Sequence, residues 1–252
     1  MEFWEFNVLQ LNPPSSPKLH YITKFINEKI DDIEGDYVEF GVYKGKSFLT
    51  IAYLLSQKDK SRKCHGYDSF NGFPETIMNH PKDDIKNFDK MYESSLISKE
   101  HYRNIERLQL HKKFISNSDS QKLQHKDLSA SGNFNSDFNL KDHIFRIAEY
   151  LDLNNIRLNT CNFIDINSYI EKIPNKIAFC LLDADLYQSY EATLPIIWEN
   201  LSENGIIFLD EYYSLKFPGA KIATDEFAKK VNCQPKKLGL SGDFERWVLC
   251  KS

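Results

Sequence analysis

The spacing of short apolar segments along this 252-residue chain restricts its fold more than any other feature. Residues 37–41 read Tyr-Val-Glu-Phe-Gly, a short strand that stops at a glycine, and residues 47–55 are strongly apolar without helix breakers, which favours a helix. A second short strand is predicted over residues 64–68. A strand, a glycine turn, a helix and a strand in this order form a βαβ unit, whose strands are almost always parallel.

The same alternation returns in the C-terminal part of the chain. The predicted strands there cover residues 156–161, 177–183 and 205–210, and the predicted helices cover residues 190–201 and 220–230. Two final strands, residues 234–240 and 245–250, are separated by Ser-Gly-Asp and predict an antiparallel hairpin. We therefore predict an α/β fold with one mostly parallel sheet, helices on both faces and a closing hairpin.

Two segments lie outside this regular pattern. Residues 1–18 contain three prolines and are predicted to form an N-terminal arm before a single domain of residues 19–252. The aromatic residues of the arm are expected to pack on the domain, with a second subunit or a site as the alternatives. Residues 70–142 are polar and too long for a simple connection. We predict that they form a lid after the second strand, above the carboxyl ends of the strands, where open α/β sheets bind ligands.

The charge balance and the cysteines exclude several classes of protein. A net charge of −4 and a pI near 6.0 argue against a nucleic-acid partner, because binding to phosphates needs a basic surface. The five cysteines lack CxxC spacing and predict neither a disulfide framework nor a zinc site. The acidic N-terminus is unlike a signal peptide, and no apolar run approaches the roughly 18 residues of a membrane span. We expect a cytoplasmic protein without a membrane partner.

The glycine turn after the first strand is typical of a ligand site. In Glu39-Phe-Gly-Val-Tyr-Lys-Gly45, the residue Gly41 permits a sharp turn, and the following helix points its positive end at that turn. The pattern is not GxGxxG, and the acid Glu39 would repel a pyrophosphate but accept a hydrogen bond from an ammonium group. A zwitterionic group such as the methionyl part of S-adenosylmethionine therefore fits better than a dinucleotide. By itself, this turn is explained equally well without any ligand.

Asp68 ends the second predicted strand, about 30 residues after Glu39. An acid at this place typically accepts the ribose hydroxyls in nucleotide-binding α/β folds. Ser69 follows it and is a candidate contact to the nucleoside. The alternative for Asp68 is a solvated aspartate in a turn.

Two acidic motifs follow two later strands. Leu182-Asp-Ala-Asp-Leu-Tyr187 follows one, and Phe208-Leu-Asp-Glu-Tyr212 follows the next. Since parallel strands end at the same edge of a sheet, Asp183, Asp210 and Glu211 are predicted to converge there. Three carboxylates in one cleft repel unless a cation compensates them, and all-oxygen ligation suits Mg²⁺, with Mn²⁺ or Ca²⁺ as alternatives. The other interpretation is that these acids cap helices or face water.

A metal at this place would serve a definite reaction. An aliphatic hydroxyl is a poor nucleophile near neutral pH, and a hard cation that binds it favours its ionised form. A neighbouring carboxylate can take the proton, so Asp183 is the candidate for ligand and general base together. Asp185 lies two residues further on and points the same way if the strand geometry persists, so it is expected to support that role.

Several motifs occur in an order that resembles the macrocin O-methyltransferase family, which includes macrolide and aminocoumarin sugar O-methyltransferases. They are Val38-Glu-Phe-Gly-Val-Tyr-Lys-Gly-Lys-Ser47, Gly66-Tyr-Asp-Ser-Phe-Asn-Gly-Phe-Pro-Glu75, Asp183-Ala-Asp-Leu-Tyr187, Asp210-Glu-Tyr212 and Pro218-Gly-Ala-Lys-Ile-Ala-Thr-Asp-Glu-Phe227. The resemblance covers most of residues 37–227. It implies a class I methyltransferase (Rossmann-like) fold, S-adenosylmethionine as donor, Mg²⁺ as activator, and a sugar or glycosylated small molecule as acceptor.

The resemblance also assigns residues. It implies that the aspartate at position 183 is metal ligand and general base, and that Asp210 and Glu211 are the other two ligands. The family more often has two aspartates there, so Glu211 is a departure that bears on metal preference. The layout is also similar to that of catechol O-methyltransferase, but Leu186 stands where that enzyme has its lysine base. This favours a sugar hydroxyl over a catechol.

Some interpretations stay open at this level. Asn162 and Phe163 either border the adenine or pack as a loop, and Tyr187 and Tyr212 either line the acceptor pocket or belong to the core. Two rival functions are an oxidoreductase that binds a nucleotide-sugar or dinucleotide, and a non-catalytic relative that binds the donor. The oxidoreductase should have a tighter glycine motif, and the non-catalytic relative should have lost the acids. The acceptor and a homo-oligomeric state are not determined by the sequence.

Overall fold

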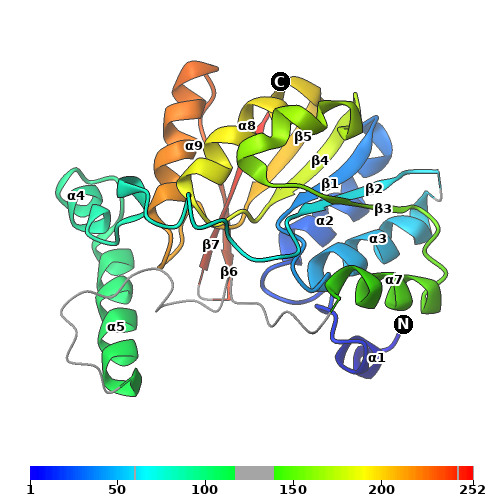
Figure 1. Ribbon diagram of the computed structural model, residues 1–252, viewed down its shortest axis with the longest axis horizontal. Helices are drawn as coiled ribbons and strands as arrows, with labels where there is room; N and C mark the ends of the chain where they lie inside the picture. The colour runs from blue at the N-terminus through cyan, green and yellow to red at the C-terminus, as the bar shows by residue number, and fades with distance from the viewer. Residues whose placement is uncertain (60, 117–138, 243, 252) are drawn as a thin grey trace.

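A seven-stranded sheet lies at the centre of the computed structural model, which describes residues 1–59, 61–116, 139–242 and 244–251 (Figure 1). Its strands are β1 (Asp36–Phe40), β2 (Cys64–Asp68), β3 (Ile156–Thr160), β4 (Ile177–Leu182), β5 (Leu201–Leu209), β6 (Lys236–Ser241) and β7 (Phe244–Cys250). Their order is β3-β2-β1-β4-β5-β7-β6. The first five strands are parallel, whereas β7 is antiparallel to both β5 and β6. The predicted fold class, a mostly parallel sheet with a C-terminal antiparallel hairpin, is confirmed.

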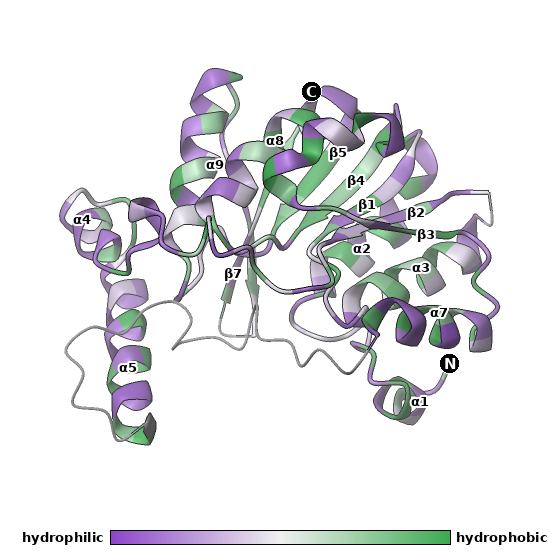
Figure 2. Cartoon of the chain, viewed as in Figure 1, coloured by the Kyte–Doolittle hydropathy of each residue, from purple (hydrophilic) through white to green (hydrophobic). Residues whose placement is uncertain are grey.

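Helices cover both faces of the sheet (Figure 1). On one face, α2 (His20–Glu28), α3 (Lys46–Lys58) and α7 (Leu140–Tyr150) pack into one apolar cluster. On the other face, α8 (Tyr187–Asn200), α9 (Pro218–Lys230) and the 3₁₀ segment η3 (Phe163–Lys172) form a second cluster. The central strands are apolar in Figure 2, as expected for parallel strands that are buried on both faces. None of the described helices is long and apolar enough to cross a membrane.

The N-terminal segment packs on the domain. It begins with a short helix, α1 (Phe3–Val8), and the buried side chains of Phe6 and Leu11 belong to the same apolar cluster as α2 and α3. The turns after Leu11 bring Lys18 to the edge of the sheet where β4 and β5 end. Of the aromatic residues of the arm, Phe6 packs on the domain as expected, whereas Phe3 and Trp4 are exposed.

The insert over residues 70–142 divides into parts with different surroundings. Its described residues include the 3₁₀ turn η2 (Pro81–Asp83), α4 (Asn87–Glu93) and α5 (Lys99–Ser116), while residues 117–138 lie outside the described part. Helices α4 and α5 project from the body beside α9 (Figure 1), and their apolar residues contact Tyr213 and Leu215. The segment before η2 contributes Phe73, Pro74 and Ile77 to the wall of a cavity at the carboxyl ends of the strands, whereas α4 and α5 lie beside α9 (Figure 1). That the insert acts as a lid stays a prediction.

Candidate functional site

The carboxyl ends of β1 to β4 border a cavity of about 360 Å³. The residues that line it come from the turns after these strands, from the insert and from two later segments. They are Gly41, Tyr43, Asp68, Ser69, Gly72, Phe73, Pro74, Ile77, Cys161, Asn162, Phe163, Asp183, Ala184, Asp185, Ser189 and Lys216. The mixture of apolar walls and a few convergent polar groups is typical of a small-molecule site. Gly41, Asp68, Ser69 and Asp183, predicted separately from the sequence, therefore meet at one cavity.

Gly41 holds the end of β1 against the end of β4. Its φ of +93° lies in the left-handed region, and a Cβ built there would stand 1.8 Å from the carbonyl oxygen of Asp183. Just before it, the carbonyl oxygen of Phe40 accepts a hydrogen bond from the Asp183 amide at 2.9 Å. Only glycine lets the two strand ends approach this closely at the cavity wall.

Asp68 is fixed by the backbone around it. Its Oδ2 accepts a hydrogen bond from the Tyr43 amide at 2.8 Å, and its Oδ1 accepts one from the Phe70 amide at 2.7 Å. Burial raises the pKa of this carboxyl, although these amides oppose the shift. A carboxylate offers about four acceptor positions. Asp68 can therefore keep both amides and still accept hydrogen bonds from a ligand in the cavity.

Ser69 and Asn162 line the cavity but also support the local backbone. The hydroxyl of Ser69 donates to the carbonyl oxygen of Gly72 at 2.6 Å, and the Asn162 side chain accepts from the Ile164 amide at 3.4 Å at the start of η3. Phe163 packs edge-on against Phe40 and lines the same wall. The two interpretations of Asn162 and Phe163, as ligand contacts or as loop packing, are therefore compatible.

Glu39 lies in the core and is not among the residues that line the cavity. It is fully buried in β1, where its carboxylate accepts hydrogen bonds from the Tyr37 hydroxyl and, at 2.6 Å, from the Ser47 hydroxyl. Burial raises the pKa of Glu39 to about 8, against the opposing effect of these hydroxyls. Both oxygens have protein partners, and the predicted contact of Glu39 with a methionyl ammonium group stays a prediction.

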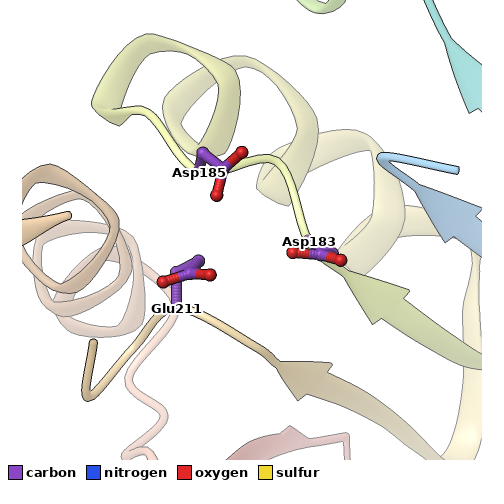
Figure 3. A group of neighbouring side chains, drawn as sticks. All are labelled: Asp183, Asp185 and Glu211. Atoms are coloured by element: carbon purple, nitrogen blue, oxygen red, sulfur yellow. The ribbon is translucent and has the colours of Figure 1, made fainter. Parts of the chain in front are cut away.

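Three carboxylates converge beside the cavity, after β4 and β5. One oxygen from each of Asp183, Asp185 and Glu211 lies within 4.8 Å of the others, and Figure 3 shows the side chains turned toward a common space. Burial raises the pKa of all three, to about 6 for Asp183 and about 8 for Glu211. Neighbouring carboxylates add to these shifts, Asp210 in all three cases, because like charges at short range disfavour ionisation. Such a group of hard oxygen donors suits Mg²⁺ or Mn²⁺.

Asp210 has cationic partners on both sides. Lys18 forms ion pairs with Oδ2 of Asp183 and, at 3.2 Å, with Oδ2 of Asp210. Arg246 of β7 contacts Oδ1 of Asp210 at 3.2 Å. Burial alone would raise the pKa of Asp210, but the charges of Lys18 and Arg246 outweigh it and hold that pKa below its usual value.

Lys18 and Arg246 were not anticipated from the sequence. Lys18 precedes Asp183 by 165 residues, and Arg246 follows Asp210 by 36. Neither lies in a motif with a recognisable spacing, so no local signal identified them.

The two tyrosines beside the acids belong to hydrogen-bonded clusters in the protein rather than to the cavity wall. The Tyr187 hydroxyl contacts Glu191 at 2.9 Å and Glu226 at 2.8 Å. The Tyr212 hydroxyl donates to Asp225 at 2.6 Å. Both residues are at most 5% exposed, which corresponds to the core interpretation.

Asp83 attaches the insert to the domain below the cavity. Its carboxylate accepts hydrogen bonds from the Tyr187 amide at 2.9 and 3.2 Å. This amide is in the first turn of α8, where backbone N–H groups have no acceptor within the helix. The carboxylate also packs closely against Gly219 at the start of α9. A Cβ added to Gly219 would lie only 1.9 Å from Oδ1 of Asp83. Burial raises the pKa of Asp83 to about 7.

We expect Asp83→Asn to change how stability depends on pH. A carboxyl whose pKa rises on folding stabilises the protein below its unfolded pKa, and this contribution is lost as pH rises through about 7. The free energy of unfolding of Asp83→Asn relative to the unchanged protein should therefore increase from pH 4 to pH 8. The increase should be on the order of 2 kcal/mol or more, since one pKa unit corresponds to about 1.4 kcal/mol. Urea denaturation across this range measures it, and a pH-independent difference would contradict the assignment.

Comparisons with known proteins point in one direction. A family model described as Macrocin-O-methyltransferase (TylF) matches residues 17–118 and 138–237, more than half of the chain. No curated protein sequence matches.

Solved structures show the same fold at low identity. The O-methyltransferase NovP is similar with a TM-score of 0.62 and 18% identity, over 94% of this chain and 80% of that one. CalS11, a calicheamicin methyltransferase, is similar with a TM-score of 0.59 and 18% identity, over 92% of this chain and 79% of that one. The SAH-bound methyltransferase PaMTH1 from Podospora anserina has a TM-score of 0.51 and 9% identity, over 98% and 86%.

Proposed function

This chain belongs to the macrocin O-methyltransferase family, and from that premise we propose that it transfers the methyl group of S-adenosylmethionine to a hydroxyl of a sugar or glycoside with the help of Mg²⁺. One observation supports this function above the others. Asp183 and Asp185 belong both to the wall of the cavity and to the group of carboxylates beside it. A donor in the cavity and a cation at the carboxylates would therefore be neighbours, as methyl transfer to an activated hydroxyl requires.

The cavity fits S-adenosylmethionine by its donor and acceptor groups. Asp68 keeps free acceptor positions for the ribose hydroxyls, and Asn162 and Phe163 offer a polar and an aromatic wall for the adenine. Gly41 leaves room at the end of β1 for the methionyl part, with the N-terminal end of α3 after it. We propose Gly41, Asp68 and Ser69 as donor-binding residues. Glu39, which lies in the core next to this wall, is proposed as a further donor-binding residue, for the methionyl end.

The carboxylates fit a hard divalent cation by their chemistry. Three clustered acids whose pKa values are raised by burial and by neighbouring carboxylates need a positive charge among them to stay ionised together. We propose that Asp183, Asp210 and Glu211 hold Mg²⁺, which would favour ionisation of the acceptor hydroxyl. Asp183, on the border of cavity and carboxylates, is the residue proposed to take the proton from that hydroxyl.

A sugar acceptor is proposed from the family and from one neighbour. The CalS11 structure is also described as that of a TDP-rhamnose 3'-O-methyltransferase, with 18% identity and a TM-score of 0.51. The insert residues Phe73 and Ile77 line the cavity together with Lys216. An uncharged hydroxyl of a polar acceptor suits this mixed surface.

Calorimetry tests the donor site directly. The unchanged protein should bind S-adenosylmethionine and S-adenosylhomocysteine, and Asp68→Asn should weaken both by about tenfold or more, because the amide cannot accept hydrogen bonds at both of its heavy atoms. The exposed Glu149→Ala in α7 serves as a control and should bind as the unchanged protein does. Absence of binding to the unchanged protein would refute the proposed function. Equal binding by Asp68→Asn would refute the role of Asp68 alone.

A further inference from the structure

One basic residue, Lys216, lines the cavity, and the other charged residues described in its wall are Asp68, Asp183 and Asp185. We propose that the Lys216 ammonium binds an anionic group of the acceptor, so that the acceptor is a sugar that carries a phosphate or diphosphate rather than a neutral glycoside. The inference rests on the proposed function and narrows the substrate class of the same site.

Lys216 lies on the side of the cavity away from the proposed ribose site. Asp68 ends β2 and Gly41 follows β1, whereas Lys216 belongs to the segment between β5 and α9. In the strand order β2-β1-β4-β5, the ends of β2 and β5 are three strand spacings apart, about 14 Å. A donor that spans Asp68 and Gly41 would direct its methyl group toward Asp183, after β4. An acceptor that approaches from the opposite side would meet Lys216.

The backbone that carries Lys216 is fixed by its neighbours. The Ser214 hydroxyl accepts hydrogen bonds from the Lys216 amide at 3.1 Å and from the Phe217 amide at 3.4 Å. Phe217 is buried in an apolar cluster with Leu186, just before α8, and with Ile77 of the insert. Lys216 therefore has a defined place beside the insert residues that line the same wall.

The charge of Lys216 is not neutralised by the part of the chain that the structure describes. Its ammonium forms no ion pair or hydrogen bond there, whereas Lys18 pairs with both Asp183 and Asp210. Lys216 is half-buried. A neutral acceptor packed against it would remove part of its hydration without supplying a counter-charge, which is unfavourable. An anionic group would form a charge-assisted hydrogen bond with it instead.

The helix N-termini next to this wall already have an acidic partner. Helices bind anions through the free amides of their first turn. Asp83 accepts a hydrogen bond from the Tyr187 amide at the start of α8, and its carboxylate packs against Gly219 at the start of α9. An anionic group of the acceptor would therefore depend on Lys216 more than on these helix ends.

A phosphate suits the Lys216 ammonium better than a carboxylate does. The ammonium is a compact charge with three donors, and Coulomb attraction grows with the charge of the partner. A phosphate ester carries a charge of roughly −2 at neutral pH, about twice that of a carboxylate. A sugar phosphate and a nucleoside diphosphate sugar both present this group next to neutral sugar hydroxyls.

Calorimetry on the protein saturated with S-adenosylhomocysteine, at one fixed Mg²⁺ concentration, tests the inference without an assay of activity. The probes are inorganic pyrophosphate, glucose phosphate, the UDP, GDP and dTDP esters of glucose, methyl glucuronide and the uncharged methyl glucoside. At least one phosphate probe should bind about tenfold or more tightly than methyl glucoside. Tighter binding of a nucleotide ester than of glucose phosphate would identify a nucleoside diphosphate sugar as the source of the phosphate.

Variants of Lys216 show whether this ammonium is responsible. Lys216→Met should weaken binding of the phosphate probe about tenfold or more, and Lys216→Arg, which keeps the charge, should weaken it by no more than about threefold. The matched control is Lys229→Met, which removes the same charge from an exposed position in the last turn of α9 and should leave binding unchanged. The thermal midpoint of each variant shows whether the fold is intact.

The outcomes separate the inference from the function on which it rests. Absence of binding by every phosphate probe, equal binding of methyl glucoside, or binding of methyl glucuronide alone would overturn the inference and leave the methyltransferase standing. Lys216→Met should bind S-adenosylhomocysteine within about twofold of the unchanged protein. A loss as large as that of the phosphate probe would assign Lys216 to the donor carboxylate and overturn the inference too. If the unchanged protein binds no S-adenosylhomocysteine, the proposed function falls and the inference with it.

Discussion

Asp183→Asn should lower the rate of methyl transfer at least about a thousandfold, because one side chain is proposed to hold the cation and to accept the proton. The side chain follows β4 at the cavity wall and belongs to the three carboxylates, and among the described residues Asp185 alone shares both places. Asparagine has nearly the same size, and it keeps an acceptor for Lys18. The loss should therefore be chemical rather than structural.

The measurement is release of S-adenosylhomocysteine from S-adenosylmethionine, with a panel of nucleotide sugars and glycosides as acceptors. Binding of S-adenosylhomocysteine to Asp183→Asn should stay within about fivefold of the unchanged protein, since the donor contacts proposed for Asp68 and Asn162 are untouched. A chelator should abolish turnover of the unchanged protein, and added Mg²⁺ should restore it. Turnover by Asp183→Asn above a tenth of the original rate, or indifference to chelation, would refute the assigned role.

Gly41→Ala should destabilise the protein by about 3–5 kcal/mol, the largest effect on stability that we expect from a single methyl group. The new Cβ would lie 1.8 Å from the Asp183 carbonyl oxygen and 2.7 Å from its carbon, so the ends of β1 and β4 must separate. The left-handed φ of +93° adds a conformational penalty for any L-residue. The same displacement would move Asp183 and reduce donor binding.

Gly242→Ala is the matched control for this prediction. Gly242 also has a positive φ, +63°, but its Cβ would meet only the side chain of Pro17, at 3.1 Å. We expect it to cost about 1–2 kcal/mol, the conformational part alone. Urea denaturation of both variants separates the close approach of the strands from the backbone penalty. Equal losses for the two variants would show that the contact between β1 and β4 adjusts freely.

The regular elements were predictable because their signals are local. The helix predicted over residues 47–55 is α3 (Lys46–Lys58), and the final hairpin is β6 and β7 within one or two residues. Strand β5 begins at Leu201, four residues before the predicted start, because pairing with β4 extends it past the polar residues that precede Gly205. Pairing with a neighbouring strand is a tertiary effect, which the secondary-structure propensities of single residues do not predict.

The insert and Asp185 illustrate the limit of local signals. A lid was predicted over residues 70–142, and among the described residues of this insert those that line the cavity come from its first part. The apolar residues of α4 and α5 pack beside α9 instead, and those of α7 pack with α3. Asp185 was expected to point with Asp183 by strand alternation, but β4 has already ended there. It reaches the same space through a left-handed turn instead.

By itself, the sequence determined that acids follow two buried strands and that a glycine turn and Asp68 follow two others. These features were predictable because the ends of strands and turns depend on residues that are neighbours in the sequence. The parallel topology then brings all of these to one edge of the sheet. Only the tertiary structure decided which of these acids have cationic partners. Lys18 meets Asp183 across 165 residues of chain, and Arg246 meets Asp210 across 36. Charge pairing at short range depends on distance in space, which spacing along the chain does not record.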